Sequence, residues 1–215
     1  MPSRVFLDSP LPENLPVVPA CRACNNGFSA DEEYLACLIE SVIAGSTDPD
    51  RIGRPQIAEI LRRSPALRSH IEAGRRQSGE QTTFDINQVR VRNVVLKLAR
   101  GHAAFELSRP CREEPSSLAW WPIPLMSPEE RDSYDASHVI QTFGEVGSRG
   151  MQRLLVTQLT LNSPTGELST LGVIVNDWVD VQDDRYRYLA VDDAGEVRIK
   201  IIIRQYLACE IVWEN

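Results

Sequence analysis

The chain has 215 residues, a formal net charge of −7, an apolar fraction of 42% and a charged fraction of 25%. This composition is typical of a globular protein with one large or two small domains, and no run of 18 apolar residues predicts a membrane span. The proline-containing N-terminus lacks the apolar stretch of a secretory signal. Five scattered cysteines do not form a disulfide framework, so we expect a cytoplasmic protein.

The first predicted element is a helix that follows a proline-rich loop over residues 1–28. Ser29 and Glu32 have the spacing of a capping box, so we expect the helix to begin at Ser29. It should end near Ala44, where Gly45 stops it. The residues expected on its apolar face are Tyr34, Leu35, Leu38, Ile39 and Val42.

The middle of the chain is predicted to be helical. Ile57, Ile60 and Leu61 have helical spacing, and Ser64 followed by Pro65 is typical of a second helix start. A longer helix is expected from about Gln88 to His102, after the short β-like run "QTTFDI".

The middle segment is also basic. Residues 47–112 carry a net charge of +6, whereas residues 1–46 carry −4 and residues 113–215 carry −9. Clustered arginines attract phosphates, so DNA is a candidate partner. The alternative is that these arginines belong to the solvated faces of two helices. The best candidates for phosphate contacts are Arg62, Arg63, Arg75 and Arg76.

The C-terminal part has a β pattern. From Ser137 onward, five or six alternating, β-branched runs are separated by short turns, and "DDAG" at 192–195 is a hairpin turn signal. These features predict an antiparallel sheet. The neighbouring Trp120 and Trp121 either plug a core or stack on bases. We therefore expect an α+β protein with an N-terminal motif over 1–46, a helical region over 47–112 and a β-rich domain over 113–215.

Cys21 and Cys24 form a Cys-x-x-Cys pair that can place two thiolates on one zinc ion. A structural zinc site needs about four ligands. No second pair is present, and Cys37, Cys111 and Cys209 are single cysteines. The three histidines lack ligand spacing. By itself, the pair supplies half of a zinc site.

The stretch "ENLPVVPACRACNNGFSADEEYL" resembles the second half of the HNH endonuclease motif, the ββα-metal fold. The resemblance covers about the first 35 to 45 residues. It implies that Asn14 fixes a loop, that Cys21 and Cys24 belong to a zinc knuckle, and that Asn25 helps to hold the catalytic divalent metal. The implied activity is metal-dependent hydrolysis of DNA phosphodiesters. Two departures are the long spacing from Asn14 to Cys21 and Ser29 at a position where many members carry Lys.

The N-terminal run "MPSRVFLDS" resembles the family segment that begins one residue after the catalytic histidine. Met1 stands where Val or Ile is usual, as expected if a GTG valine codon was taken as the start. The general-base histidine and the first cysteine pair would then lie upstream. Mg²⁺ or a similar ion, together with structural Zn²⁺, is expected for the full-length family, and whether this chain binds either is open.

Two functions therefore follow from the sequence. The first is an HNH-endonuclease-like protein that is inactive as this chain, because no general base can be identified and Asp8 is a poor candidate. The alternative is a non-catalytic module that binds nucleic acid or protein and retains the motif as a structural remnant.

Overall fold

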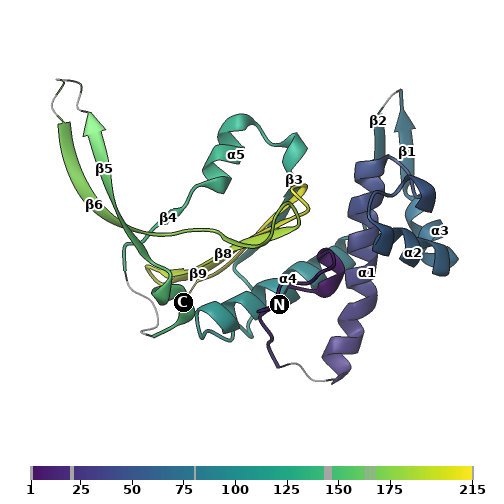
Figure 1. The fold of residues 1–215 in the computed structure, drawn as a ribbon, viewed down its shortest axis with the longest axis horizontal. Helices are drawn as coiled ribbons and strands as arrows, with labels where there is room; N and C mark the ends of the chain where they lie inside the picture. Colours follow the sequence, from purple (N-terminus) through teal and green to yellow (C-terminus); the bar gives the residue numbers. More distant parts are fainter. Residues whose placement is uncertain are drawn as a thin grey trace. The chain divides into compact units, whose positions relative to one another are not determined.

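The computed structural model describes residues 2–19, 22–79, 81–142, 147–162, 164, 166 and 168–214; for residues 22–26, 81 and 159 it describes the backbone alone. The chain divides into two compact units, residues 1–98 and residues 99–215. The helices and antiparallel sheets confirm the predicted α+β class (Figure 1). The three-segment division drawn from composition stays a prediction. Within the described residues, no helix combines the length and apolar character needed to cross a membrane.

Unit 1 is mainly helical. Its elements are η1 (Arg4–Phe6), α1 (Arg22–Ala44), η2 (Pro49–Arg51), α2 (Pro55–Arg63), α3 (Pro65–Ala73), β1 (Arg75–Ser78), β2 (Gln81–Phe84) and the first part of α4 (Gln88–Glu106). The strands β1 and β2 form an antiparallel hairpin, of which the sequence indicated only β2.

Helix α1 begins seven residues earlier than predicted. Ser29 lies inside the helix, so its assignment as the N-cap is wrong. Glu32, the expected partner in the capping box, instead accepts a hydrogen bond from Ser3 and pairs with Lys97. The predicted end is confirmed: Gly45 has φ +61°, and the amides of Gly45 and Ser46 donate to the carbonyls of Val42 and Ser41, as in a Schellman motif.

The central turns of α1 form the core of unit 1. Residues 34–41 are all buried, including Cys37 and Glu40, so the buried surface is wider than the single apolar face that the sequence indicated. Ile57, Ile60 and Leu61 of α2 are also buried, as predicted. The Tyr34 hydroxyl accepts a hydrogen bond of 2.9 Å from the Asn87 amide, which fixes α1 to the start of α4.

Unit 2 is built around a five-stranded antiparallel sheet in the order β3-β10-β9-β8-β7, and a smaller sheet has the order β4-β6-β5. The unit contains the last part of α4. Its other elements are β3 (Ser117–Pro122), η3 (Ile123–Leu125), α5 (Pro128–Asp135), β4 (His138–Val139), α6 (Arg149–Gln152), β5 (Leu155–Asn162), β6 (Leu168–Asn176), β7 (Val179–Gln182), β8 (Tyr186–Asp193), β9 (Glu196–Ile203) and β10 (Leu207–Glu214).

In unit 2, one hairpin turn was predicted from the local sequence and one strand was not. The β8–β9 turn has positive φ at Ala194 and Gly195, as a two-residue type I′ turn requires, and this confirms the hairpin signal. The strand β3 was not predicted. It places Trp121 edge-on to Tyr134, with ring centroids 6.3 Å apart, so Trp121 packs beside an aromatic ring while remaining 38% exposed.

Candidate functional site

The described motif residues lie in the loop before α1 and in the first turn of that helix. Because the helix begins at Arg22, the backbone of Cys24 and Asn25 lies in its first turn. Cys21 lies outside the described residues, as do the side chains of Cys24 and Asn25. Asn14 lies in an exposed turn before the helix.

Positions 25, 29 and 32 share one face of α1, since helical spacing places residues four and three apart on the same side. On this face, Ser29 is exposed and Glu32 accepts a hydrogen bond of 2.9 Å from Ser3. The N-terminal segment therefore runs beside the face that carries position 25.

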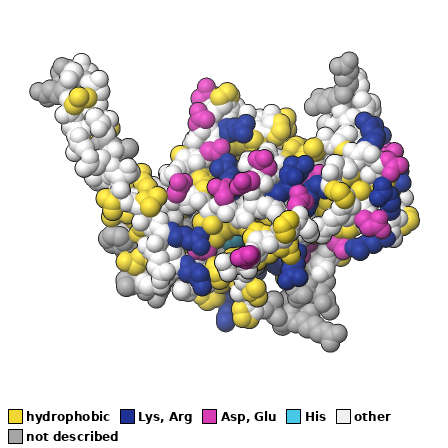
Figure 2. Space-filling view, viewed as in Figure 1, with side chains coloured by type: hydrophobic (Ala, Val, Ile, Leu, Met, Phe, Trp, Pro, Cys, Tyr) yellow, Lys and Arg dark blue, Asp and Glu magenta, His cyan; other side chains and the backbone are white. Residues whose placement is uncertain are grey.

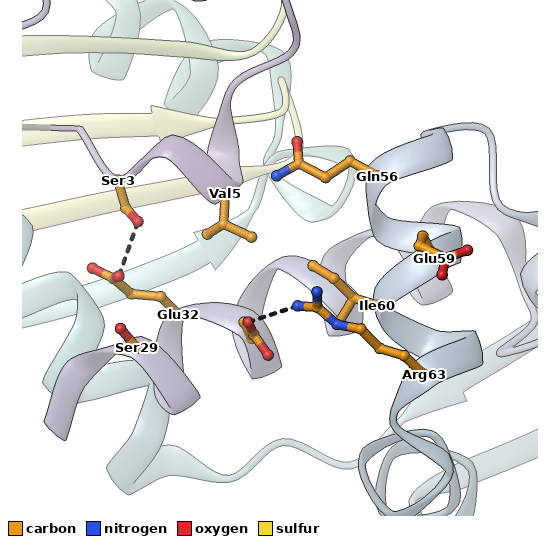
Figure 3. A pocket seen from close by; sticks show the side chains of 9 residues that line it. Ser3, Val5, Ser29, Glu32, Gln56, Glu59, Ile60 and Arg63 are labelled. Carbon is orange, nitrogen blue, oxygen red and sulfur yellow. Dashed lines mark hydrogen bonds and ion pairs between the residues drawn. The ribbon is translucent and has the colours of Figure 1, made fainter. Parts of the chain in front are cut away.

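A cleft of about 320 Å³ opens between η1, α1 and α2 (Figure 3). Its wall from α1 presents Ser29 and Glu32, and its wall from α2 presents Gln56 and Arg63. Arg63 Nη2 lies 3.1 Å from Glu33 Oε1, and Glu32 is held by Ser3 and Lys97. The cleft is polar, and these contacts balance the charge of Glu32 and Glu33.

Arg54 holds the N-terminal segment in place. Its guanidinium is 4% exposed and donates to Asp8 at 2.7 Å, to the Leu7 carbonyl at 2.8 Å and to the Val5 carbonyl at 3.2 Å. Its Nη1 also lies 3.6 Å from Glu40 on α1. The buried Arg54 guanidinium, which we call the Arg54 fork, therefore links residues 5–8 to α1. Asp8, which we considered as a possible catalytic carboxylate, is a partner in this ion pair.

Outside the Cys-x-x-Cys pair, Cys37 and Cys209 are buried and Cys111 is half-buried. Burial raises the pKa of the Cys37 thiol to about 12, and burial also raises the pKa of Cys111 and Cys209. Within the described part of the chain, no group of three or more His, Cys, Asp or Glu side chains is arranged to hold a metal ion.

Each of the three histidines has a described neighbour within its own unit. The His70 ring lies beside the Tyr34 ring, with centroids 5.8 Å apart. In unit 2, the His138 Nε2 lies 2.8 Å from Asp193 Oδ2, and His102 is fully buried. Burial lowers the pKa of His102 to about 3, so its imidazole is neutral at physiological pH.

Each of the four arginines proposed to contact phosphate has a carboxylate partner. These pairs are exposed, and exposed ion pairs contribute about 0–1 kcal/mol. DNA phosphate would therefore replace an existing partner at each position. The nitrogen–oxygen distances are 2.8 Å for Arg62 and Asp50, 3.1 Å for Arg63 and Glu33, 3.3 Å for Arg75 and Glu72, and 2.7 Å for Arg76 and Asp85.

Sequence reasoning missed the residues that shape this site. Arg54 lies 46 residues from Asp8, and Arg90 donates to Asp31, 59 residues away, at 2.6 Å. No local pattern links residues at such separations. Arg54 lies between Gly53 and Pro55, just before α2, and nothing in this local sequence indicates a buried ion pair.

Comparisons with known proteins returned no matching family model, no matching curated protein and no matching solved structure.

Proposed function

We propose that the chain is an HNH-endonuclease-like protein whose first turn of α1 faces a DNA phosphate, and that it is inactive by itself because it has no identified general base. The observation that supports this most is the position of the helix start. Because α1 begins at Arg22, the run Cys24-Asn25 lies at the positive end of the helix dipole, where phosphate is favoured.

The rest of α1 supports the proposal by giving that turn a rigid base. Residues 34–41 are buried in unit 1, and the segment 5–8 is fixed to the helix by Arg54. A helix of 23 residues held in this way positions its first turn reproducibly.

The sequence identifies no general base for this site. Hydrolysis requires a group that removes a proton from the attacking water. We therefore propose that a free imidazole in solution replaces the missing side chain.

The experiment is a plasmid-nicking assay with the purified chain in Mn²⁺ or Mg²⁺, with and without about 50 mM imidazole at a pH near 7, where about half or more of the imidazole is neutral. The proposal predicts no nicking without imidazole, nicking with imidazole, and no nicking in EDTA. Absence of any imidazole-dependent nicking contradicts the proposal.

A non-catalytic module remains the second candidate, and the exposed arginines support it. It predicts DNA binding that weakens steeply as salt rises, without cleavage in either metal. A gel-shift series at increasing salt, made with the same protein preparation, distinguishes this result from hydrolysis.

A further inference from the structure

Strands β5 and β6 form a two-stranded ribbon, which we call the arm (residues 155–162 and 168–176). Eight residue pairs join the strands, from Leu155 opposite Val175 to Asn162 opposite Leu168. Figure 1 shows the outer part of the arm lying apart from the five-stranded sheet of the same unit. The short strand β4 pairs only with the inner end, at Val175 and Asn176.

The arm is exposed on both faces. Every described side chain of β5 is exposed, and so are the first five residues of β6, Leu168–Gly172. Large apolar side chains share this exposure. The exposed fractions are 54% for Leu155, 80% for Val156, 52% for Leu161, 72% for Leu168 and 55% for Leu171.

One face of the arm is more apolar than the other. Successive residues of a strand point to opposite faces, so the register assigns each residue to a face. The opposite face carries the apolar residues Val156, Leu168 and Ile174 together with Gln158, Thr160, Asn162, Thr170 and Gly172. The face that we call the apolar face carries Leu155, Thr157, Leu161, Ser169, Leu171, Val173 and Val175.

The arm also lacks charge. Residues 155–162 and 168–176 include no Lys, Arg, Asp or Glu, and Figure 2 shows neither dark blue nor magenta on the visible surface of the outer arm. Natural edge strands are usually protected by charged residues or proline, and β5 has neither. A two-stranded ribbon without a cover is also only marginally stable in water.

We propose that the apolar face of the arm packs against the same face of a second copy of this chain. An uncharged apolar surface is complementary to another such surface, and a twofold axis through the middle of the arm brings identical faces together. In an antiparallel arrangement, the inner end of one arm, at Leu155, meets the outer end of the other, at Leu161. This inference is independent of the proposed nuclease function.

The size of the face sets the expected affinity. Eight residue pairs at about 3.4 Å per residue and two strands about 4.8 Å apart give a face of roughly 250 Å² per copy. This is well below the area of a standard interface. The dimer is therefore weak and depends on protein concentration.

The test is sedimentation equilibrium of the full chain from about 2 to about 200 µM, a range that covers micromolar dissociation constants. The variant is Leu171→Glu, on the apolar face. The matched control is Thr170→Glu, the neighbouring residue on the opposite face. Both positions are exposed, so both variants should fold, and far-UV circular dichroism checks this.

The proposal predicts that the wild-type chain associates to a dimer as concentration rises. Leu171→Glu raises the dissociation constant about tenfold or more, because it buries an unpaired charge, and Thr170→Glu changes it by less than about threefold. A wild-type chain that stays monomeric throughout the range overturns the proposal. Equal effects of the two variants also overturn it, because they show that the apolar face is not the contact.

Discussion

The Tyr188 hydroxyl donates a hydrogen bond of 2.5 Å to Glu106 Oε1 in the interior of unit 2. Glu106 is 1% exposed, and its other carboxyl oxygen has no partner among the described residues. Arg153 Nη2 lies 3.4 Å from the same Oε1. The bond joins α4 to β8, so it holds the helix against the sheet.

Removal of the Tyr188 hydroxyl should destabilise unit 2. Tyr188→Phe leaves the buried Glu106 carboxylate with one donor fewer, which costs about 1–3 kcal/mol in the free energy of unfolding. Urea denaturation measures the change. The control is Tyr206→Phe, at a half-buried tyrosine in the turn between β9 and β10, and similar losses in the two variants would contradict the role of the Tyr188–Glu106 bond.

His102 should make stability depend on pH in the mildly acidic range. Its Nε2 lies 2.7 Å from the Tyr186 hydroxyl, its ring stacks on Tyr188, and burial lowers its pKa from 6.5 to about 3. Below pH 6.5, His102 is therefore protonated in the unfolded chain but stays neutral in the folded chain. The contribution of His102 to the free energy of unfolding is fully present above pH 6.5 and is lost as pH falls from 6.5 toward 3.

The measurement is the free energy of unfolding at pH 7 and pH 5, compared with the same difference in His102→Gln. Wild type should lose about 2 kcal/mol more than the variant between these two pH values. An unchanged pH dependence in His102→Gln would show that His102 is not the group responsible.

Asp193 should contribute stability that is lost at lower pH. Burial alone raises its pKa, but hydrogen bonds from His138, the Gln141 and Thr142 amides and the Thr142 hydroxyl outweigh this and lower the pKa from 3.8 to about 2. The contribution is present above pH 3.8 and disappears as pH falls from 3.8 to 2.

Asp193→Asn should therefore destabilise the protein by about 1–3 kcal/mol at pH 7. The difference between wild type and variant should shrink between pH 4 and pH 2. Asp184→Asn, in the turn between β7 and β8, is the matched control and should cost little. If the difference at pH 2 equals that at pH 7, the hydrogen-bonded carboxylate is not its source.

Arg54 should be the most sensitive charged residue of unit 1. Arg54→Met leaves Glu40, which is 3% exposed, without its guanidinium neighbour and removes the donors to the Val5 and Leu7 carbonyls. Loss of one partner of a buried ion pair costs about 3–5 kcal/mol. Amide hydrogen exchange in η1 and α1 measures the effect, with Arg51→Met at an exposed position as the control. Protection in η1 that is equal in the two variants would contradict this account.

Local patterns predicted the elements whose determinants are close in sequence. The end of α1 at Gly45 and the turn at Ala194–Gly195 depend on residues that accept positive φ, and both were found as expected. The start of α1 was missed because Glu32 bonds to Ser3 and Lys97 instead of closing a capping box. The strand β3 was missed because it pairs with β10, about 90 residues away.

In the candidate site, too, local sequence did not predict contacts between residues that are far apart in the chain. Local sequence predicted a helix that ends at Gly45, and the assignment of the run from Cys21 to Asn25 to an HNH-like motif stays a prediction. The cleft and the Arg54 fork depend on contacts between η1, α1 and α2, whose residues are far apart in the chain. The positions of these residues in the sequence do not predict that they are in contact.

The measurement that tests the central claim most directly compares Asn25→Ala with Asn26→Ala in the imidazole-dependent nicking assay. The two positions are adjacent on α1 and differ by about 100° around the helix axis. The account predicts that Asn25→Ala lowers the imidazole-dependent rate about 100-fold, whereas Asn26→Ala changes it by less than about threefold. Equal rates in the two variants would contradict a role for the first turn of α1 in hydrolysis.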